Sequence, residues 1–287
     1  MTEDILVSDL ITLMESSDLP PWRRDWRGAS GPHRNLATGQ PYRGSNPILL
    51  ELGSILRGHN MPLWIGGAQA KASGWFPRKG CKSVRIVRPQ TNQREEAGEN
   101  GADPVIRTWT SYKGVPVFNA ADLVGGTEAA SAELAAAISK ALGTDGPKPT
   151  HQRLDRAETV LESWTVPTVF GGSRACYSPA ADQISMPEPD DFETREGFCA
   201  TWAHEQVHST GHADRLARSF GRADYAREEL IAELGSVLVC YRLQIGYNLA
   251  NHAAYMASWA TMLREDAKVL YKVLSEARKA ADLIVAE

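Results

Sequence analysis

Hydrophobic positions along the first part of the chain change from helical to strand-like spacing. Apolar residues from Ile5 to Met14 recur at helical intervals and predict a helix that ends before Pro20 and Pro21. Asn46 followed by Pro47 indicates an N-cap and a proline in the first turn of a second helix. β-branched and aromatic residues then predict strands over 83–88, 105–112 and 115–118, with the polar insert 91–104 as a hairpin loop.

The second part of the chain is predicted to be mainly helical. Alanine-rich residues 127–142 and the Gly- and Pro-containing residues 143–149 indicate a connecting helix and a linker. A helix near 154–164 and short strands within 168–187 follow, and then helical patterns over 192–210, 225–243 and 251–284. We therefore expect an α+β protein of two domains: a small α+β domain over 1–125 and, after the connection 126–149, a mainly helical domain with a short sheet over 150–287.

Composition narrows the class of protein. A length of 287 residues with 43% hydrophobic content is sufficient for two cores. The four cysteines are scattered without a CxxC pair, which disfavours a disulfide framework or a cysteine zinc site. The sequence lacks a run of 18 apolar residues and begins with acidic residues, so we expect a cytoplasmic protein without a membrane partner.

The net charge of −4 conceals a division between two parts of the chain. Residues 20–94 contain 13 Lys or Arg and two acidic residues, a balance of +11, whereas residues 126–287 contain 16 basic and 23 acidic residues, a balance of −7. A basic segment of this kind favours a polyanionic partner, because cations that neutralise phosphates release counterions. The alternative is a solvated basic surface without a partner.

The stretch TWAHEQVHSTGHADRL at 201–216 contains the motif HExxH. On a helix, His204 and His208 point to one face and can occupy two corners of a tetrahedral Zn²⁺ site. Glu205 is turned away by about a quarter of a circle and can take a proton from zinc-bound water. Apolar neighbours such as Trp202 and Val207 favour a buried helix over a surface helix with two unrelated histidines. A short sheet packed on helices that carry this motif is typical of zincin peptidases.

Several separate motifs then carry a resemblance to a known family. They are NLATGQ at 35–40, YRGSN at 42–46, the spacing of Trp64, Gln69 and Gly74, KGxK at 79–82, CYSPAADQISMP at 176–187, HEQVHSTGH at 204–212, RL at 215–216 and REELIAEL at 227–234. Nearly the whole chain resembles the ArdC-type antirestriction proteins of conjugative plasmids. Their first domain is shared with TraC-type primases, and their second is a SprT-like zincin. Cys81, in place of an expected acidic residue, and the insert 91–104 depart from the pattern.

The resemblance implies that the first domain binds single-stranded DNA with little sequence preference, as the basic segment and its aromatic residues also suggest. Trp22 and Trp26 lie in an Arg-rich loop and are better stacking candidates than Trp64 and Trp75, which we expect in the core. Asn46 and Tyr42 have alternative roles as a helix cap and a turn anchor. The predicted DNA-binding residues are Trp22, Arg23, Arg24, Trp26, Arg27, Arg34, Asn35, Tyr42, Arg43, Asn46, Gln69, Lys71, Lys79 and Lys82.

The third metal ligand has three candidates. The motif HExxHxxGxxD also fits, with Gly211 permitting a sharp turn and Asp214 closing the site, and His212 is another claimant. We favour Glu229, because it lies on a predicted helix whose apolar face should pack on the HExxH helix. Glu233, four residues further on, could then fix the tautomer of a ligand imidazole. This arrangement is that of the gluzincins, with Zn²⁺ as the expected metal and Mn²⁺ as an alternative.

Three functions are consistent with these features. The first is an antirestriction or DNA-protection protein, plasmid- or phage-borne in bacteria, that coats a single strand and carries a zinc peptidase-like centre. The second is a DNA-binding accessory with a purely structural metal. The third is a DNA-dependent protease that acts on DNA-bound proteins. The expected partners are single-stranded DNA and, for the first and third functions, restriction enzymes or other DNA-bound proteins.

Overall fold

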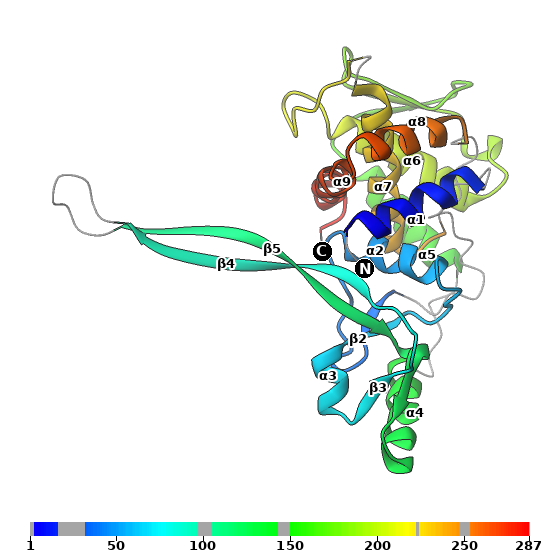
Figure 1. Cartoon of the computed structure of the whole chain (residues 1–287). Coiled ribbons are helices and arrows are strands. Elements are labelled where there is room, and N and C mark those ends of the chain that lie inside the picture. Colours follow the sequence, from blue (N-terminus) through cyan, green and yellow to red (C-terminus); the bar gives the residue numbers. More distant parts are fainter. Residues whose placement is uncertain are drawn as a thin grey trace.

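A long two-stranded arm projects from a body of helices and small sheets (Figure 1). The computed structural model describes residues 3–16, 32–96, 105–142, 150–221, 224–246 and 253–286. Within these residues helices and strands are mixed as the sequence predicted, and the α+β class is confirmed. None of the described helices is long and apolar enough to cross a membrane.

The described residues up to 125 contain two sheets and three α-helices. One has the strand order β1-β2-β5-β4, with β1 parallel to β2 and the other pairs antiparallel, and the second pairs β3 with β6. The elements are α1 (Glu3–Ser16), β1 (Arg34–Asn35), α2 (Asn46–Ile55), β2 (Leu63–Gly66), α3 (Gly67–Ala72), β3 (Trp75–Pro77), β4 (Val84–Glu96), β5 (Val105–Asn119) and β6 (Leu123–Gly125).

The arm is formed by β4 and β5, which are longer than predicted. Their register runs from Val84 opposite Val117 to Glu96 opposite Val105. The prediction of a loop over 91–104 was wrong up to Glu96, and the predicted strands 105–112 and 115–118 are one strand. Pairing with β5 explains the difference, because backbone hydrogen bonds and a cross-strand bond of 2.7 Å from Asn92 to Ser111 hold these polar residues extended. Residues 97–104 lie outside the described residues.

The described residues from 128 onward contain most of the helices and a three-stranded sheet of order β7-β9-β8. The elements are α4 (Glu128–Leu142), α5 (Thr150–Glu162), β7 (Thr168–Phe170), β8 (Cys176–Ser178), β9 (Gln183–Met186), α6 (Arg195–Ser209), α7 (Tyr225–Leu243), α8 (Ala253–Glu265) and α9 (Val269–Ile284). The predicted helix 251–284 is therefore wrong, since α8 and α9 are separate. They are divided where the Asp266 carboxylate accepts a hydrogen bond of 2.9 Å from the Lys268 backbone.

Asn46 does not cap its helix, which corrects the prediction. Ser45 occupies the N-cap position of α2, and the Asn46 side chain exchanges two hydrogen bonds with the Val87 backbone, of 3.0 and 2.8 Å. The amide thus ties the start of α2 to β4. β4 is an edge strand, so Val87 has a strand partner on one side alone. The Asn46 carboxamide donates and accepts at once and satisfies the backbone of Val87 on the other side.

The main apolar core includes both ends of the chain. Leu10 of α1 and Leu49 of α2 lie in the same cluster as residues of α6, α7, α8 and α9, and α1 packs on α8. A smaller cluster joins Trp75 of β3 to Leu134 of α4. Burial of both Trp64 and Trp75 confirms their expected place in the interior. The domain boundaries at 125 and 150 stay a prediction, because helices from both sides share one core.

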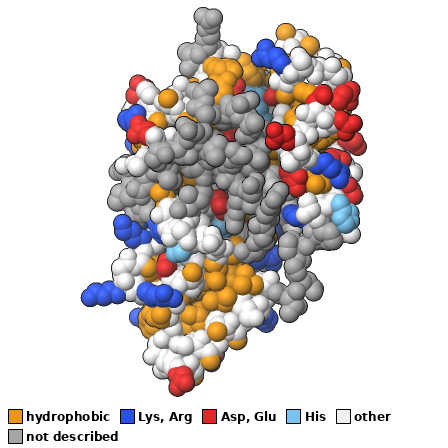
Figure 2. Space-filling view, turned by 90° about the vertical axis from the view of Figure 1, so that its right-hand side faces the viewer, with side chains coloured by type: hydrophobic (Ala, Val, Ile, Leu, Met, Phe, Trp, Pro, Cys, Tyr) orange, Lys and Arg blue, Asp and Glu red, His pale blue; other side chains and the backbone are white. Residues whose placement is uncertain are grey.

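Surface chemistry differs between the two ends of the body. On the face shown in Figure 2, hydrophobic side chains gather over the lower part and acidic side chains over the upper right part. Phe76 of β3 and Val124 of β6 are among the exposed large hydrophobic residues, at 43% and 41% exposure. The acidic upper part agrees with the negative balance of residues 126–287.

A close contact between α6 and α7 positions the two helices that carry the HExxH motif and REELIAEL. A Cβ added to Gly235 of α7 would lie 2.7 Å from one methyl group of Val207 and 3.0 Å from the other. Such distances leave no room for a side chain, so glycine allows the helices to approach. The absence of a side chain at residue 235 therefore sets the separation of α6 and α7.

We expect Gly235→Ala to lower the free energy of unfolding by about 1–3 kcal/mol through overpacking. Alanine in an open helix interior would instead raise it by about 1 kcal/mol relative to glycine. Thermal and urea unfolding measure the change. In a Val207→Ala background, adding Gly235→Ala should lower the free energy of unfolding by less than it does in the wild type, since the clashing methyl groups are gone. A single variant more stable than the wild type would contradict the close contact.

Candidate metal centre

Helix α6 presents the two histidines of the HExxH motif on one face. The Thr194 hydroxyl caps the helix by accepting a hydrogen bond of 3.0 Å from the Gly197 backbone. Four residues apart, His204 and His208 meet with their ring centroids 4.7 Å apart and their Nε2 atoms 3.1 Å apart. Both imidazoles therefore converge on one point beside α6.

Glu229 of α7 completes the cluster. One carboxylate oxygen lies 3.7 Å from His204 Nε2, and the other lies 3.6 Å from His208 Nε2. Tetrahedral zinc with bonds of about 2.0–2.1 Å holds its donor atoms about 3.3 Å apart. The three side chains thus offer a donor set and a spacing that fit a divalent metal, and they form the one such group among the described residues.

The electrostatics of Glu229 favour its role as an anionic donor. Burial raises the pKa of this carboxyl, but a hydrogen bond with His204 and the charges of His208 and His204 outweigh it and lower the pKa to about 2. A hydrogen bond from Tyr225 acts in the same direction. Glu229 is consequently ionised at neutral pH, as metal ligation requires.

The rival ligands lie elsewhere. The Asp214 side chain is 85% exposed and lies 3.5 Å from His212, and neither belongs to the cluster within the described part of the chain. Gly211 does not adopt the left-handed conformation expected of a sharp glycine turn. A Cβ there would approach Phe220 to 2.8 Å and Arg218 to 3.0 Å, so this glycine makes room for those side chains. Gly211 of the HExxHxxGxxD pattern is therefore explained by close packing against Phe220 and Arg218, without a role in metal ligation.

A buried ion pair next to His208 was missed from the sequence. Arg218 donates to both carboxylate oxygens of Glu228, over 2.8 and 2.9 Å, and Glu228 lies 3.2 Å from His208 Nδ1. A proton held on Nδ1 by Glu228 leaves Nε2 free to face a metal. Burial raises the pKa of Glu228, but its bonds with Arg218 and His208 lower it overall.

The sequence contained a signal for Glu228, because it stands directly before Glu229 in REELIAEL. Adjacent helical residues point about 100° apart, so the two carboxylates reach different atoms of the histidines. Glu233, predicted to fix a tautomer, is fully buried, and its carboxylate lies 3.9 Å from His204 Nδ1. This distance is that of an ion pair and exceeds a hydrogen bond. Its role as a positioning residue stays a prediction.

Glu205 follows His204 on α6 and is buried, with 7% of its surface exposed. Its assignment as the proton acceptor stays a prediction. Arg215, next to Asp214 in sequence, forms an ion pair with Asp182 and donates to the Ser209 backbone over 2.7 Å. These contacts give Arg215 a structural role next to the exposed Asp214.

Three of the predicted DNA-binding residues meet on the surface of the first sheet. The Asn35 amide donates to Tyr42 over 3.3 Å and to Gln69 over 3.1 Å, while its oxygen accepts from the backbone of Ala37 and Thr38. Desolvation raises the pKa of Tyr42, which is half-buried. The group therefore shapes the loop after β1 as well as presenting polar atoms.

The other predicted DNA-binding residues differ in their contacts and exposure. Asn46 faces the Val87 backbone, so its amide is already occupied. The cationic candidates are exposed or half-exposed; they are Arg34, Arg43, Lys71, Lys79 and Lys82. Outside the described residues are Trp22, Arg23, Arg24, Trp26 and Arg27.

Two histidines and a glutamate on neighbouring helices beside a short sheet define a zincin-like metallopeptidase domain, and residues 155–276 match the family model of zincin-like metallopeptidases. Residues 2–118 match the N-terminal domain of the anti-restriction factor ArdC. The chain belongs to the ArdC antirestriction family.

Solved and curated relatives agree with this assignment. The metal-free crystal structure of the antirestriction ArdC protein from plasmid R388 is 31% identical, with 99% of this chain and 96% of that chain covered and a TM-score of 0.72. Its Mn(II)-bound form is 30% identical, with 99% and 97% covered and a TM-score of 0.69. An uncharacterised protein, y4eC, of Sinorhizobium fredii (strain NBRC 101917 / NGR234) is 30% identical over 93% of this chain and 85% of its own length.

The chain also resembles part of a larger enzyme. Two proteins named DNA primase TraC of Escherichia coli are 30% and 32% identical over 99% and 93% of this chain. This chain spans only 20% and 25% of their respective lengths. The shared region is consequently one part of each primase.

We expect Glu229→Ala to lose most of the bound divalent metal and to lower the melting temperature measured with metal present. Asp214→Ala, which removes an exposed carboxylate outside the cluster, should retain metal and stability. Elemental analysis after dialysis, together with calorimetric titration of Zn²⁺ and Mn²⁺, measures both. Metal retained by Glu229→Ala and lost by Asp214→Ala would show that the site is of the aspartate type.

Glu228→Gln should weaken metal binding about 10- to 100-fold, because a partner that orients His208 is changed while all three donors remain. Glu158→Gln is a matched control, since Glu158 pairs with Arg195 on the surface away from the histidines. Equal metal affinity in the two variants would argue against a positioning role for Glu228.

Proposed function

We propose that the protein protects DNA from restriction by binding single strands without sequence preference. The observation that carries the proposal is the placement of like charges on the arm: Arg88 lies directly opposite Lys113. Like charges at directly opposed positions destabilise a strand pair. A phosphate backbone along the arm would remove that cost.

The first sheet supplies a second set of groups suited to a nucleic acid. The Asn35, Tyr42 and Gln69 network offers amide and hydroxyl groups, which commonly contact phosphate and sugar. Lys71, Lys79 and Lys82 are exposed cations in the same part of the chain. Phosphate contacts position a strand without reading its sequence, which supports non-specific binding. In our proposal, Trp22 and Trp26 add base stacking and so favour single strands.

The cluster on α6 and α7 suits a resident metal in this proposal. His204, His208 and Glu229 would hold Zn²⁺, with Mn²⁺ as the alternative. A bound divalent ion supplies Lewis acidity and lowers the pKa of its water to about 7. The Glu205 carboxylate would accept a proton, and Glu228 would hold the proton of His208 on Nδ1 so that Nε2 faces the metal.

A second candidate function is proteolysis of DNA-bound proteins. The observation that favours it is the burial of Glu205 beside the histidines, because a carboxylate at this position of a zincin motif suits proton transfer. The two functions are compatible, since a protease of this kind must also hold DNA. A metal with a purely structural role remains as the third reading, and it predicts that Glu205 is dispensable.

The setting of the proposed function is the cytoplasm of a bacterium that receives or replicates plasmid or phage DNA. The relatives include an antirestriction protein and proteins named DNA primase, which supports a role at single strands. Restriction enzymes and DNA-bound proteins are the proposed protein partners.

The full chain should bind a labelled single strand more tightly than the matching duplex in fluorescence anisotropy. Affinity should fall with salt, with a log–log slope of about −0.7 per neutralised phosphate of a single strand. Trp22→Ala and Trp26→Ala should each weaken binding by about 1–3 kcal/mol. Phe170→Leu, which changes an aromatic residue of 38% exposure on β7, is the control. Equal affinity for duplex and single strand would refute the stacking contribution.

Glu205→Gln separates protection from proteolysis. Restriction of incoming plasmid DNA in cells that express each variant reports protection, and cleavage of a DNA-bound substrate protein with and without single strands reports proteolysis. We expect protection to survive the change and any DNA-stimulated cleavage to disappear. Loss of protection in Glu205→Gln, with metal and DNA binding intact, would mean that protection requires the chemistry at this centre.

A further inference from the structure

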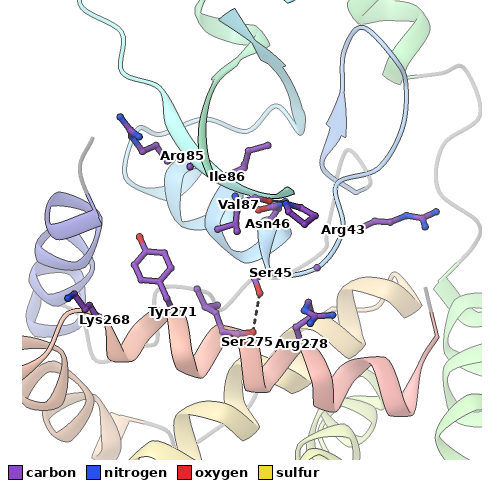
Figure 3. A pocket seen from close by; sticks show the side chains of 14 residues that line it. Arg43, Ser45, Asn46, Arg85, Ile86, Val87, Lys268, Tyr271, Ser275 and Arg278 are labelled. Carbon is purple, nitrogen blue, oxygen red and sulfur yellow. Dashed lines mark hydrogen bonds between the residues drawn. The ribbon is translucent and has the colours of Figure 1, made fainter. Parts of the chain in front are cut away.

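A large cavity lies where the base of the arm meets α9 (Figure 3). Its volume is about 910 Å³, and its walls come from residues 43–46, from the first part of β4 with Gly114 of β5, and from residues 268–278. This volume is near the upper end of the range of small-molecule and cofactor sites, about 300–1,000 Å³. The cavity is distinct from the metal cluster, which shares none of its lining residues.

The lining is cationic. Arg43, Arg85, Lys268 and Arg278 contribute to it, and none of its residues is acidic. Figure 3 shows Arg43 and Arg85 extending outward at the rim, Lys268 at the start of α9 and Arg278 further along that helix. The Arg278 guanidinium donates to Asp282 over 2.6 Å, so one counter-charge lies just outside the lining. The Asp266 carboxylate accepts a hydrogen bond from the Lys268 backbone, so a second counter-charge lies at that end. Four cations in the lining, against two carboxylates just outside it, favour an anionic occupant.

The rest of the lining suits a flat apolar group. Tyr271 points from α9 toward the side of the cavity that carries Arg85 and Ile86 (Figure 3). Ile86, Val87 and Leu274 add apolar surface. An aromatic ring and aliphatic walls among cations combine stacking with phosphate attraction, which is the pairing used to bind single-stranded nucleic acids. In a duplex the base faces are stacked on one another, so only an unpaired base can enter such a space.

Helix α9 is firmly held as one wall of the cavity. The Ser45 hydroxyl donates to the Leu274 backbone over 3.0 Å. Gly44 adopts a left-handed conformation with φ of +67°, and a Cβ there would lie 3.3 Å from the Arg278 side chain. Because residues 44 and 45 fit closely against α9, the segment that follows Arg43 and the helix that carries Arg278 are held together.

We propose that Lys268, the N-cap residue of α9, and Tyr271 and Arg278 of α9, together with Arg43 and Arg85, bind nucleotides of a single DNA strand in this cavity. The inference rests on the proposed single-strand binding and extends it. The strand contacts both halves of the chain, and α9 of the zincin-like half supplies a base-stacking residue and phosphate contacts. Of these five residues, only Arg43 was predicted from the sequence.

The test uses the full chain and a fluorescein-labelled oligothymidylate. Tyr271→Leu should weaken binding about 5- to 150-fold, the equivalent of one lost stack, while Tyr271→Phe keeps the ring and should bind close to the wild type. Lys268→Ala should make the log–log salt slope shallower by about 0.7, the contribution of one phosphate of a single strand. Lys272→Ala is the matched control, since Lys272 is a lysine of the same helix, 67% exposed and outside the lining.

Each outcome has a separate meaning. Unchanged melting temperatures and metal content in the variants show that lost affinity is not a folding defect. Wild-type binding with Tyr271→Leu and Lys268→Ala both indistinguishable from Lys272→Ala would overturn the cavity assignment and leave the proposed function standing. A wild-type chain that fails to bind the oligothymidylate would overturn the proposed function itself, and the cavity assignment with it.

Discussion

The contact between α6 and α7 buries a group of charged side chains that must compensate one another. The side chains of Arg218, Glu228, Glu229 and Glu233 are each at or below 9% exposure beside two histidines. Each charge removed from water costs several kcal/mol, so the group is stable only when its members are paired. Arg218 pairs with Glu228, and Glu229 lies against both imidazoles. A divalent cation among three buried carboxylates would add positive charge where the protein lacks it.

This arrangement depends on packing that reaches across the chain. Gly235 lets α7 approach Val207, and α9 covers α7 from another side, since a Cβ at residue 235 would also lie 3.5 Å from the Ala277 backbone. Helices α1 and α2 complete the same core. Residues near the N-terminus therefore help to hold the metal cluster in place, and α9 connects that cluster to residues 43–46. The metal cluster and the cavity next to residues 43–46 therefore both depend on the packing of α9, although they share no residues.

Local patterns predicted the features that depend on local geometry. The bounds of α7 were predicted to the residue, and helical spacing placed His204 and His208 together. Choosing Glu229 required only that its helix pack on α6. The sequence did not predict the length of the arm, because pairing with β5 overrides the polar character of residues 91–96. Nor did it predict Glu228 as a partner of His208, because that contact depends on the rotation of α7 about its axis.

The cavity could not be predicted from local sequence patterns either, and its lining gives a protein of negative net charge a local surface that suits a polyanion. Its cations come from segments more than 200 residues apart, and Lys268 and Arg278 belong to the half whose balance is −7. Electrostatic attraction follows the local field of a surface and not the net charge of the molecule. Beyond a Debye length of about 8 Å at physiological salt, the acidic surface is largely screened. In our proposal the strand binds at the arm, the first sheet and the junction with α9, and the acidic surface of the second half repels phosphates only within that distance.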